Sequence, residues 1–379
     1  MYYSIIHGFV TVSQNKLCYN PFRMEKKQIS EKQARDLCAW YEKNKRALPW
    51  RDTGNPYDVW LSEIMLQQTR IEAVRERFRE FRRQLPSVAD VAECEDDRLM
   101  RLWEGMGYYS RARNLKKCAA VLCEQYGGEF PKDVNALKRL PGIGPYTAGA
   151  IASICFDLPA CAVDGNVMRV ISRLCLIEDD IREAKTKAEI EKMIMPVLNL
   201  ETVRPSVFNQ ALMELGETVC LPNGKPACER CPLHDSCLAR AKNLTDRIPY
   251  RSKLKDRSIE QRTLLIIRDG ERFLMNRRPD TGLLASLYEF YGVDGWLNEK
   301  EALAEVQRLG LSPLRIHPLP ESKHIFTHKE WHMRAWEILV EDASDFAKES
   351  MFPVTKKELA SLAVPSAFRT YTDWYSLRG

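Results

Sequence analysis

The chain has 379 residues, which is long enough for two or three domains with separate hydrophobic cores. Hydrophobic residues make up 45% and charged residues 29%, the balance of an ordinary soluble globular protein, and no apolar run reaches the roughly 20 residues of a membrane span. A net charge of +5 does not by itself indicate a nucleic-acid partner. Twelve cysteines without a secretory signal indicate a reducing, cytoplasmic compartment, where thiols or metal ligands are expected rather than disulfides.

The first part of the chain has the periodicity of helices. Residues 1–27 are expected to form a disordered leader. Ser30 and Gln33 then form an S-x-x-Q capping box, and helical periodicity continues to about residue 240. Six arginines crowd residues 70–83, for which a solvated helix face is the simplest interpretation. We therefore expect an all-α domain over residues 28–240.

The stretch WLSEIMLQQT, residues 60–69, places one acid in an apolar helix. Asp58 before it is a candidate N-cap, and Glu63 has Trp60 and Leu66 three residues away on its own helix face. Burial at this position would raise the pKa of Glu63 above its usual value, as a general acid requires. The alternative is a glutamate at the helix edge whose carboxylate extends to water.

The stretch LPGIGPYTAGAI, residues 140–151, predicts a tight turn between two helices. Gly142 and Gly144 allow the backbone to approach a partner closely, and the helix N-terminus that follows them favours an anion. A DNA phosphate, bound without reading the base sequence, fits this pattern. An ordinary corner between two helices, packed by small residues, is the alternative.

Asp164 precedes another helix, in the stretch AVDGNVMRVISR. Its plain role is that of an N-cap, and a carboxylate held by backbone N–H groups is also expected to stay ionised. The chain thus offers one carboxyl expected to be protonated, Glu63, and one expected to be ionised. Two carboxyls with separated pKa values are the arrangement that cleaves glycosidic bonds through an oxocarbenium-like transition state.

Four cysteines lie within eighteen residues of a loop that contains Pro and Gly. Their spacing is C-x7-C-x2-C-x5-C, a strong signal for a metal site formed by Cys220, Cys228, Cys231 and Cys237. Zinc modules usually carry two C-x2-C pairs, and only one is present in this loop. The pattern favours a 4Fe-4S cluster over zinc, with free structural thiols as a third interpretation.

The composition and the periodicity of the sequence change after residue 240. Residues 241–258 are polar and basic and predict a linker. The segment around Asp269-Gly270 then predicts a β-hairpin, residues 322–340 predict a second one, and residues 299–309 predict a helix. These elements indicate an α+β domain over residues 259–379.

In order along the chain, these motifs resemble those of bacterial adenine DNA glycosylases of the MutY type, in the helix-hairpin-helix superfamily that includes endonuclease III. The resemblance runs from about residue 28 to the end and covers SEIMLQQT, GMGYYSRARNL, LPGIGPYTAGAI, VDGNVMRV and the cysteine loop. It implies a multidomain protein with a helix-hairpin-helix core, a 4Fe-4S cluster and a Nudix-like C-terminal domain. It also implies a monomeric base-excision repair enzyme, associated with the nucleoid when on DNA. Its substrate would be double-stranded DNA with adenine mispaired with 8-oxoguanine or guanine.

The resemblance further implies roles for individual residues. Glu63 would protonate N7 of an adenine flipped out of the duplex, and Asp164 would stabilise the sugar cation that remains. Tyr146 stands where endonuclease III-like enzymes carry a lysine that attacks C1′, which implies a monofunctional glycosylase that leaves an abasic site. The other implied residues are Asn166, which supports the aspartate; Trp50, Arg51, Leu66 and Gln210 in the adenine pocket; Gln68 and Tyr108 as a wedge in the duplex; and Gln67, Thr69, Gly142 and Gly144 as further DNA contacts. As alternatives, Trp50 and Tyr108 are core aromatic residues and Gln210 is a surface amide.

The chain departs from the family pattern at three places. The first cysteine spacing is usually x6, so one residue is added to the loop. The Nudix box G-x5-E-x7-R-E-U-x-E-E-x-G-U lacks its R-E-U-x-E-E core, which indicates a binding module rather than a pyrophosphatase. The lesion-reading motif Phe-Ser-His is present as Phe326-Thr327-His328, in which threonine keeps the hydroxyl and adds a methyl group.

Three rival functions are weighed against this interpretation. An endonuclease III-like glycosylase and lyase acting on oxidised pyrimidines is disfavoured by Tyr146. A non-catalytic DNA-binding scaffold with an Fe–S cluster is disfavoured by the presence of Glu63 and Asp164. A nucleotide pyrophosphatase run by the C-terminal domain is disfavoured by its incomplete Nudix box.

Overall fold

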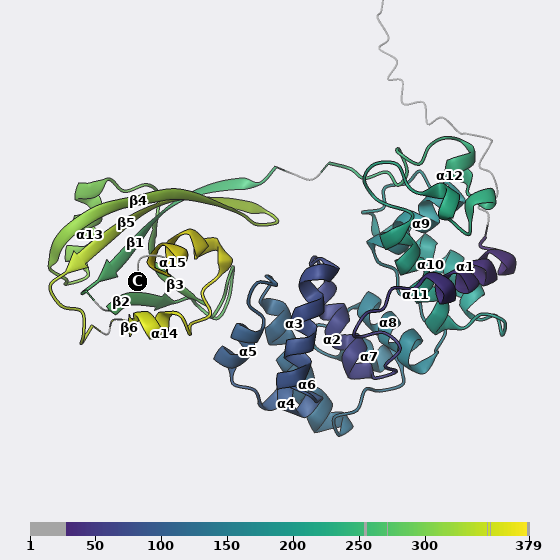
Figure 1. The fold of residues 1–379 in the computed structure, drawn as a ribbon, viewed down its shortest axis with the longest axis horizontal. Helices are drawn as coiled ribbons and strands as arrows, with labels where there is room; N and C mark the ends of the chain where they lie inside the picture. The colour runs from purple at the N-terminus through teal and green to yellow at the C-terminus, as the bar shows by residue number, and fades with distance from the viewer. Residues whose placement is uncertain (1–27, 254–255, 271, 347, 349, 377–379) are drawn as a thin grey trace, which may run out of the picture.

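The computed structural model describes residues 28–253, 256–270, 272–346, 348 and 350–376, and the predicted leader lies outside these residues. Up to Ala241 the described chain is helical, and strands begin at Ser258 (Figure 1). The α-helices of the first part are α1 (Glu31–Asn44), α2 (Pro56–Leu66), α3 (Ile71–Gln84), α4 (Val88–Glu93), α5 (Asp96–Leu102), α6 (Ser110–Tyr126), α7 (Val134–Arg139), α8 (Pro145–Phe156), α9 (Gly165–Cys175), α10 (Ala184–Leu198), α11 (Pro205–Thr218) and α12 (Leu238–Ala241).

The first two helices begin at residues that satisfy their free N–H groups. The predicted capping box is confirmed, since Ser30 and Gln33 exchange both of its hydrogen bonds at the start of α1. The prediction of Asp58 as the N-cap of α2 was wrong. Asn55 is the N-cap, with its side chain 2.9 Å from the Tyr57 N–H, and Pro56 follows at the first helical position. Asp58 lies inside the helix and is buried, where it forms an ion pair with Arg82 of α3.

The helical part contains two buried clusters. One is built by α2 to α8, includes Trp60, Phe81 and Trp103, and continues into buried residues of the C-terminal part. The other is built by α1 and α9 to α11 and includes Leu37 and Phe208. Figure 1 shows the same division, with α2 to α8 in one group and α1, α9, α10 and α11 in the other. The chain crosses between the clusters after α1 and again after α8, so loops and helix ends from both meet along the boundary.

Part of the predicted linker packs on the helical part. Ile248 is buried, and its carbonyl accepts a 2.8 Å hydrogen bond from Nε of Arg173 in α9. The Ser252 N–H donates to Asp180 at 3.1 Å. The segment up to Ser252 is therefore fixed against α9 and the loop that follows it. The limits 241 and 258 stay a prediction of where one domain ends and the next begins.

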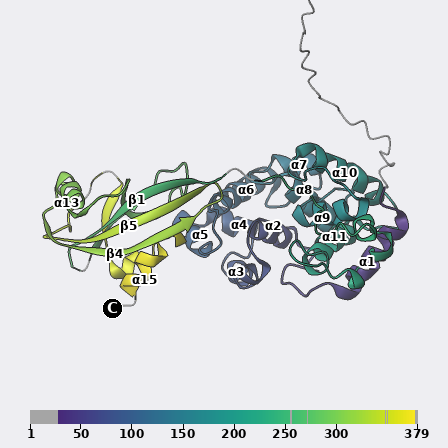
Figure 2. The ribbon, with the colours of Figure 1, turned by 90° about the horizontal axis from the view of Figure 1, so that it is seen from above.

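The C-terminal part is a six-stranded sheet with helices on both faces. Its strand order is β4-β5-β1-β3-β2-β6, and both predicted hairpins and the predicted helix are confirmed. The elements are β1 (Ser258–Arg268), β2 (Arg272–Arg277), β3 (Tyr288–Asp294), α13 (Glu299–Arg308), β4 (Pro313–Ile325), β5 (Lys329–Val340), β6 (Met351–Thr355), α14 (Lys356–Leu359) and α15 (Arg369–Ser376). Buried residues of α13 pack with one face of the sheet, and those of α14 and α15 pack with the other. Figure 2 shows α13 and α15 on opposite sides of the strands.

The neighbouring strands β5 and β1 run parallel although they are far apart in sequence. The pairing of β1 with β5 starts at Ser258 opposite Lys329 and continues to Arg268 opposite Leu339. The turn between β4 and β5 is tied to the start of β1, because the Ser258 N–H donates to the His328 carbonyl at 3.3 Å and Arg257 Nε donates to the Phe326 carbonyl at 3.1 Å.

The C-terminal part contacts α5, α6 and the loop between them. The Tyr288 hydroxyl lies 3.1 Å from Asp97, and Arg113 donates to the Ala285 carbonyl at 2.8 Å. A third contact joins Tyr108, at the end of the α5–α6 loop, to Thr327 of the β4–β5 turn at 2.8 Å. These polar contacts place the β4–β5 turn next to the α5–α6 loop.

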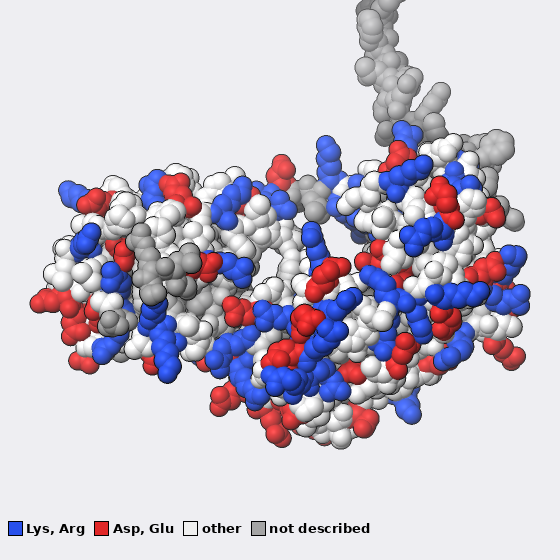
Figure 3. All heavy atoms as spheres, viewed as in Figure 1, with Lys and Arg blue, Asp and Glu red and all other residues white. Residues whose placement is uncertain are grey.

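Charged residues of both signs cover the surface. Figure 3 shows Lys and Arg over the face of the helical part, with Asp and Glu among them. Several arginines of the 70–83 segment are paired within the chain, Arg83 with Glu80 at 2.6 Å and Arg79 with Glu76. This pairing agrees with the interpretation of a solvated helix face. Within the described residues, no helix combines the length and the apolar character that crossing a membrane requires.

Candidate active site

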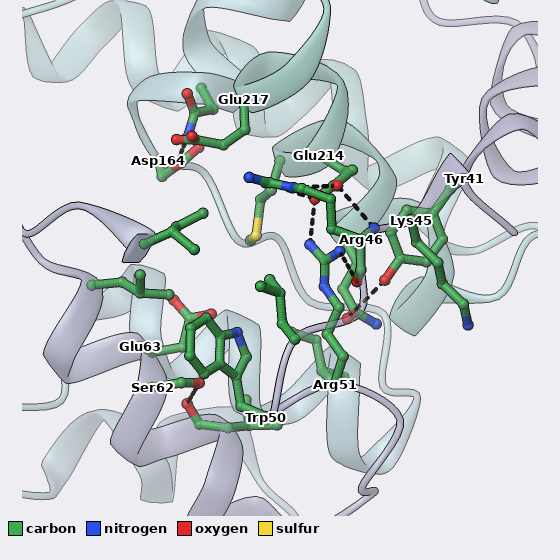
Figure 4. Close-up of a pocket in the computed structure, with 18 of the residues that line it drawn as sticks. Tyr41, Lys45, Arg46, Trp50, Arg51, Ser62, Glu63, Asp164, Glu214 and Glu217 are labelled. Carbon is green, nitrogen blue, oxygen red and sulfur yellow. Dashed lines mark hydrogen bonds and ion pairs between the residues drawn. The ribbon is translucent and has the colours of Figure 1, made fainter. Parts of the chain in front are cut away.

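A pocket of about 1040 Å³ lies between the two helical clusters and collects most of the predicted site residues (Figure 4). Its walls come from α1, the loop before α2, the end of α2, the start of α8, the residues before α9, and α11. The predicted residues that line it are Trp50, Arg51, Glu63, Leu66, Gln67, Gln68, Thr69, Tyr146, Asp164, Asn166 and Gln210. Tyr108, Gly142, Gly144, the Phe326–His328 motif and the four cysteines do not line it.

Glu63 is buried at the floor of this pocket. Its side chain comes from the middle of α2, whose other residues pack in the core, and only 8% of the residue is exposed. One carboxyl oxygen accepts a 2.6 Å hydrogen bond from the Tyr146 hydroxyl. The pKa of Glu63 is raised to about 7, chiefly by burial; the Tyr146 hydrogen bond and Arg51 lower it, and the Asp164 charge adds to the rise. The raised pKa expected from the sequence is confirmed.

Tyr146 stands over Glu63 from the first turn of α8. Its hydroxyl also lies 3.8 Å from the Met213 sulfur. Burial and the charges of Glu63 and Asp164 raise the pKa of this phenol well above its usual value. Tyr146 is thus a neutral hydrogen-bond donor to Glu63 at any pH near neutrality.

Asp164 is the N-cap of α9, as predicted, and also faces the pocket. One carboxyl oxygen accepts the Val167 N–H at 2.7 Å, and the other accepts the Asn166 side-chain amide at 2.9 Å. These hydrogen bonds lower its pKa, but burial is the larger effect and the net direction is upward. A side chain turned into the pocket loses water that the cap does not fully replace. That Asp164 stays ionised remains a prediction, since a raised direction by itself does not make the carboxyl neutral.

Asn166 is held by charged neighbours on both sides. Its amide also donates to Glu217 at 3.0 Å, and its oxygen accepts from Arg169 at 2.7 Å. Arg169 in turn donates to the Cys220 carbonyl at 2.7 Å. Asn166 is therefore fixed in an orientation that presents its N–H₂ group to Asp164.

The wall opposite the two carboxyls contains an ion cluster that the sequence analysis missed. Glu214 of α11 is fully buried and accepts hydrogen bonds from Arg46 at 2.6 Å and from Arg51 at 2.5 Å. Burial raises its pKa, but these two guanidinium groups outweigh that effect and the net direction is downward. Figure 4 shows the cluster beside Tyr41, across the pocket from Glu63 and Asp164. The sequence contains a signal for the burial of Glu214, because this residue lies among apolar residues at helical spacing, as Glu63 does.

The remaining predicted pocket residues have mixed surroundings. Trp50 is buried with its ring edge-on to Phe78 at a centroid distance of 5.3 Å, so it belongs to the core and to the pocket wall together. Gln210 is half-buried and accepts a hydrogen bond from the Tyr41 hydroxyl at 3.1 Å, which excludes a free surface amide.

The predicted wedge residues lie on two neighbouring loops. Gln68 and Tyr108 are exposed and both adopt left-handed backbone conformations, with φ of 58° and 47°. Tyr108 is 45% exposed, so the alternative of a core aromatic residue was wrong. The loop after α2, which carries Gln68, contacts the loop before α6, which carries Tyr108. The Thr69 hydroxyl of the first loop lies 3.4 Å from the Met106 carbonyl of the second.

The glycine turn before α8 has different requirements at its two glycines. Gly142 has a φ of 74°, and a Cβ atom there would approach the Asn114 Cβ to 2.7 Å. Gly144, the N-cap of α8, would meet nothing within 4 Å. The protein itself therefore requires glycine at 142, whereas the space at 144 is open to a partner.

Comparisons with known proteins agree with this architecture. A model of the HhH-GPD superfamily of base excision DNA repair proteins matches residues 61–196, and a NUDIX domain model matches residues 262–374. The adenine DNA glycosylase of Mus musculus is 31% identical over 401 residues, which span 89% of this chain and 77% of that protein. This chain belongs to the adenine DNA glycosylases of the MutY type.

Other relatives of this glycosylase extend the comparison. The adenine DNA glycosylase of Buchnera aphidicola subsp. Baizongia pistaciae is 31% identical over 317 residues, 82% of this chain and 87% of that protein. A solved structure titled "Structure of a non-covalent Endonuclease III-DNA Complex" is 26% identical and covers 57% of this chain and 98% of that one, with a TM-score of 0.48. The glycosylase is thus a hydrolase of base-excision repair, with a helical HhH-GPD domain followed by an α+β Nudix domain.

The four cysteines of the glycosylase lie in the loop between α11 and α12, which contains the short helices η1 (Cys228–Arg230) and η2 (His234–Ser236). All four are partly buried. The pKa of the Cys231 thiol is raised to about 12, chiefly by burial. Arg173 donates to the Cys220 sulfur at 3.3 Å. No group of three or more metal-binding side chains arranged around a single ion is found among the residues that the structure describes.

Proposed function

We propose that this glycosylase is monofunctional and hydrolyses the bond between C1′ and N9 of an adenine mispaired with 8-oxoguanine or guanine. One observation carries the proposal. Glu63, a buried glutamate with a pKa of about 7, lies in one pocket with a second carboxyl, Asp164. The side chain that contacts Glu63 there is the phenol of Tyr146 and not an amine. The pocket is large enough for a nucleotide that has left the duplex.

In the proposed first step, Glu63 donates its proton to N7 of the flipped adenine. The C1′–N9 bond then breaks, its electron pair leaves with the adenine, and a cation remains on the sugar. Tyr146 donates to one oxygen of Glu63, which leaves the other oxygen available to carry the proton toward the base. Asp164 faces the same pocket, where its negative charge would stabilise the sugar cation.

In the second step, water adds to C1′ and gives a proton to Glu63, which restores the starting carboxyl and leaves an abasic site. Tyr146 supports a reaction that ends at this point. A lyase needs an amine to form an imine with C1′, and a phenol whose pKa is raised well above 10 supplies neither an amine nor a ready anion. Asn166 supports Asp164 by holding its carboxylate in place.

The pocket walls suit a planar, uncharged base. Trp50 and Leu66 give apolar surface, and Gln210 gives an amide group. The buried Glu214 fixes Arg51 at the pocket wall by a charge-assisted hydrogen bond. These groups support the assignment of this region to the adenine.

The proposed DNA contacts lie outside the pocket. The exposed Gln68 and Tyr108 would enter the duplex at the mispair, with Gln67 and Thr69 beside them. Gly142 and Gly144 would bring the N-terminus of α8 to a phosphate. The motif Phe326-Thr327-His328 would recognise 8-oxoguanine, supported by its position in the turn beside Tyr108. The Nudix domain would act only in binding.

We also infer that Cys220, Cys228, Cys231 and Cys237 hold a 4Fe-4S cluster. The donor set fits by its chemistry, because four thiols with the spacing C-x7-C-x2-C-x5-C lie in one loop, all four are partly buried, and Arg173 donates to the Cys220 sulfur at 3.3 Å. Such a group would fix the loop between α11 and α12. We further propose that the glycosylase is a cytoplasmic monomer.

The test is single-turnover incubation with labelled duplexes, one with adenine opposite 8-oxoguanine and one with thymine glycol opposite adenine. We expect breakage of the adenine strand only after alkali, no borohydride trapping, and no base release by Glu63→Gln. Direct breakage at thymine glycol, or trapping of the enzyme on DNA, would identify the endonuclease III-like rival. Adenine release by Glu63→Gln would overturn the role of Glu63, and absence of release by the unmodified enzyme would favour a non-catalytic scaffold.

A further inference from the structure

One guanidinium group connects the catalytic helix to both wedge loops. Arg111, in the first turn of α6, is buried, and the four N–H groups of its Nη1 and Nη2 atoms are shared among six acceptors. Its acceptors are the carbonyls of Ile64, Met65 and Gln67 at 2.7, 2.9 and 2.7 Å, the Thr69 hydroxyl at 3.2 Å, and the carbonyls of Met106 and Gly107 at 2.7 and 3.1 Å. The same group lies over the rings of Trp103 and Tyr108 at 5.3 and 5.5 Å.

These partners belong to two functional segments. Three of the carbonyls end α2 within one turn of Glu63, where a helix leaves its last carbonyls without partners. The other acceptors lie in the loops that carry Gln68 and Tyr108. Both of these residues have left-handed backbones, a conformation that costs free energy in residues other than glycine. Arg111 therefore fixes the strained loops and the end of the catalytic helix to the same planar group.

Stability alone gives little reason for a charge at this position. Among the described residues, Arg111 forms no ion pair with a carboxylate, and its Nε is buried without a hydrogen-bond partner. Burial lowers the pKa of this guanidinium to about 10, which shows that the site disfavours the charge. A planar donor group that reaches six acceptors at once explains its presence, since a lysine has only three donor hydrogens on one nitrogen.

We propose that Arg111 is a positioning residue that fixes the wedge residues Gln68 and Tyr108 relative to Glu63. When the wedge enters the duplex at a mispair, Arg111 transmits the displacement of the loops to the catalytic helix α2. The inference rests on the proposed function of Glu63, Gln68 and Tyr108. Tyr108 also bonds to Thr327 of the β4–β5 turn, so the same connection extends from the lesion-reading motif to α2. Along this connection, from Thr327 through Tyr108 and Arg111 to the end of α2, each residue contacts the next.

The test is Arg111→Lys in the full-length enzyme, with exposed Arg101→Lys of α5 as the matched control. Under single-turnover conditions the amplitude reports the active fraction, and the rate constant reports the arrangement of the active site. We expect the rate constant for adenine opposite 8-oxoguanine to fall at least tenfold in Arg111→Lys with the amplitude retained. Binding to a duplex with 2′-fluoro-deoxyadenosine, which resists cleavage because fluorine destabilises the sugar cation, should change less than threefold.

A reduced amplitude with an unchanged rate constant would show a merely structural role and overturn the proposal. If Arg111→Lys does not fold, Thr69→Val removes one acceptor while keeping the guanidinium, and we expect a twofold to threefold slower rate constant. An unchanged rate constant in Thr69→Val would then overturn it. Inactivity of the unmodified enzyme would instead contradict the proposed function, so the two failures are distinguishable.

Discussion

The side-chain oxygens of Tyr108 and Thr327 lie 2.8 Å apart and join the two domains of the glycosylase. Tyr108 ends the loop before α6 and Thr327 lies in the β4–β5 turn, 219 residues further along the chain. Both hydroxyls are exposed, so either can exchange this hydrogen bond for one to DNA. The contact brings a proposed wedge residue and a proposed lesion-reading residue to one point.

Removing the Thr327 hydroxyl should reduce discrimination between the two mispairs. A hydrogen bond contributes about 1 kcal/mol net, so Thr327→Val should lower the preference for adenine opposite 8-oxoguanine over adenine opposite guanine by up to about fivefold. Single-turnover rates on both duplexes measure this ratio. Thr327→Ser keeps the hydroxyl and serves as the control. Equal preferences in the two variants would show that the hydroxyl does not read the lesion.

The rate of adenine release should fall as the pH rises through about 7, because the general acid must carry a proton and burial raises the Glu63 pKa to that value. Tyr146→Phe removes a hydrogen bond that lowers this pKa, so its rate profile should shift to higher pH. Single-turnover rates between pH 5 and 9 on one duplex test both statements. A shift of the Tyr146→Phe profile to lower pH would contradict the assignment.

The same titration predicts how stability changes with pH. The pKa of Glu63 is about 7 in the folded state and 4.5 in the reference state, so the folded protein retains a proton that the unfolded chain loses. This contribution is complete below pH 4.5 and disappears as the pH rises to about 7, a loss of at most about 3 kcal/mol. Unfolding in urea should therefore show Glu63→Gln gaining stability relative to the unmodified enzyme over that window. A constant difference across the window would mean that Glu63 is not buried in solution.

Asp164→Asn should separate catalysis from capping. Asparagine and aspartate are about equally good N-caps, so the free energy of unfolding should change by less than about 1 kcal/mol. The charge facing the sugar cation is lost, and the single-turnover rate should fall by about 100-fold or more. Asp133→Asn is the matched control, since Asp133 caps α7 outside the pocket with a 2.7 Å hydrogen bond from Ala136. An Asp164→Asn enzyme as fast as Asp133→Asn would leave Asp164 as a cap only.

Replacing one cluster cysteine should remove the metal. Purified enzyme is expected to contain about four iron atoms per chain, and Cys228→Ser should lower this content and the melting temperature together. Cys123→Ser, at a partly buried cysteine of α6, should change neither. Iron content by elemental analysis decides the outcome. Stoichiometric zinc in place of iron would refute the cluster assignment.

Local rules in the sequence were sufficient for part of this site. The spacing around Glu63 indicated burial, and the residues around Asp164 indicated a cap, because both properties depend on near neighbours in the chain. Asp58 was misassigned because Asn55 with Pro56 competes for the same helix start. Only the fold shows that Arg82 pairs with Asp58 instead.

The residues that the sequence did not reveal act through contacts distant in the chain. Glu214 meets Arg46 across 168 residues, and Arg111 meets the end of α2 across more than 40. The net direction of the Asp164 pKa also depended on the fold, since two opposing effects differ only through the depth of the pocket. Periodicity and spacing carry no information about such pairs.

The parallel pairing of β1 with β5 has a consequence for where the reading turn lies in the Nudix domain. Because β1 starts opposite Lys329, the chain enters this domain beside the turn that carries Phe326-Thr327-His328. The end of β1 at Arg268 and the pairing of Arg272 with Thr355 lie at the opposite end of the strands. The reading turn is therefore built where the chain arrives from the helical part, and its position depends little on the length or packing of the far end of the sheet.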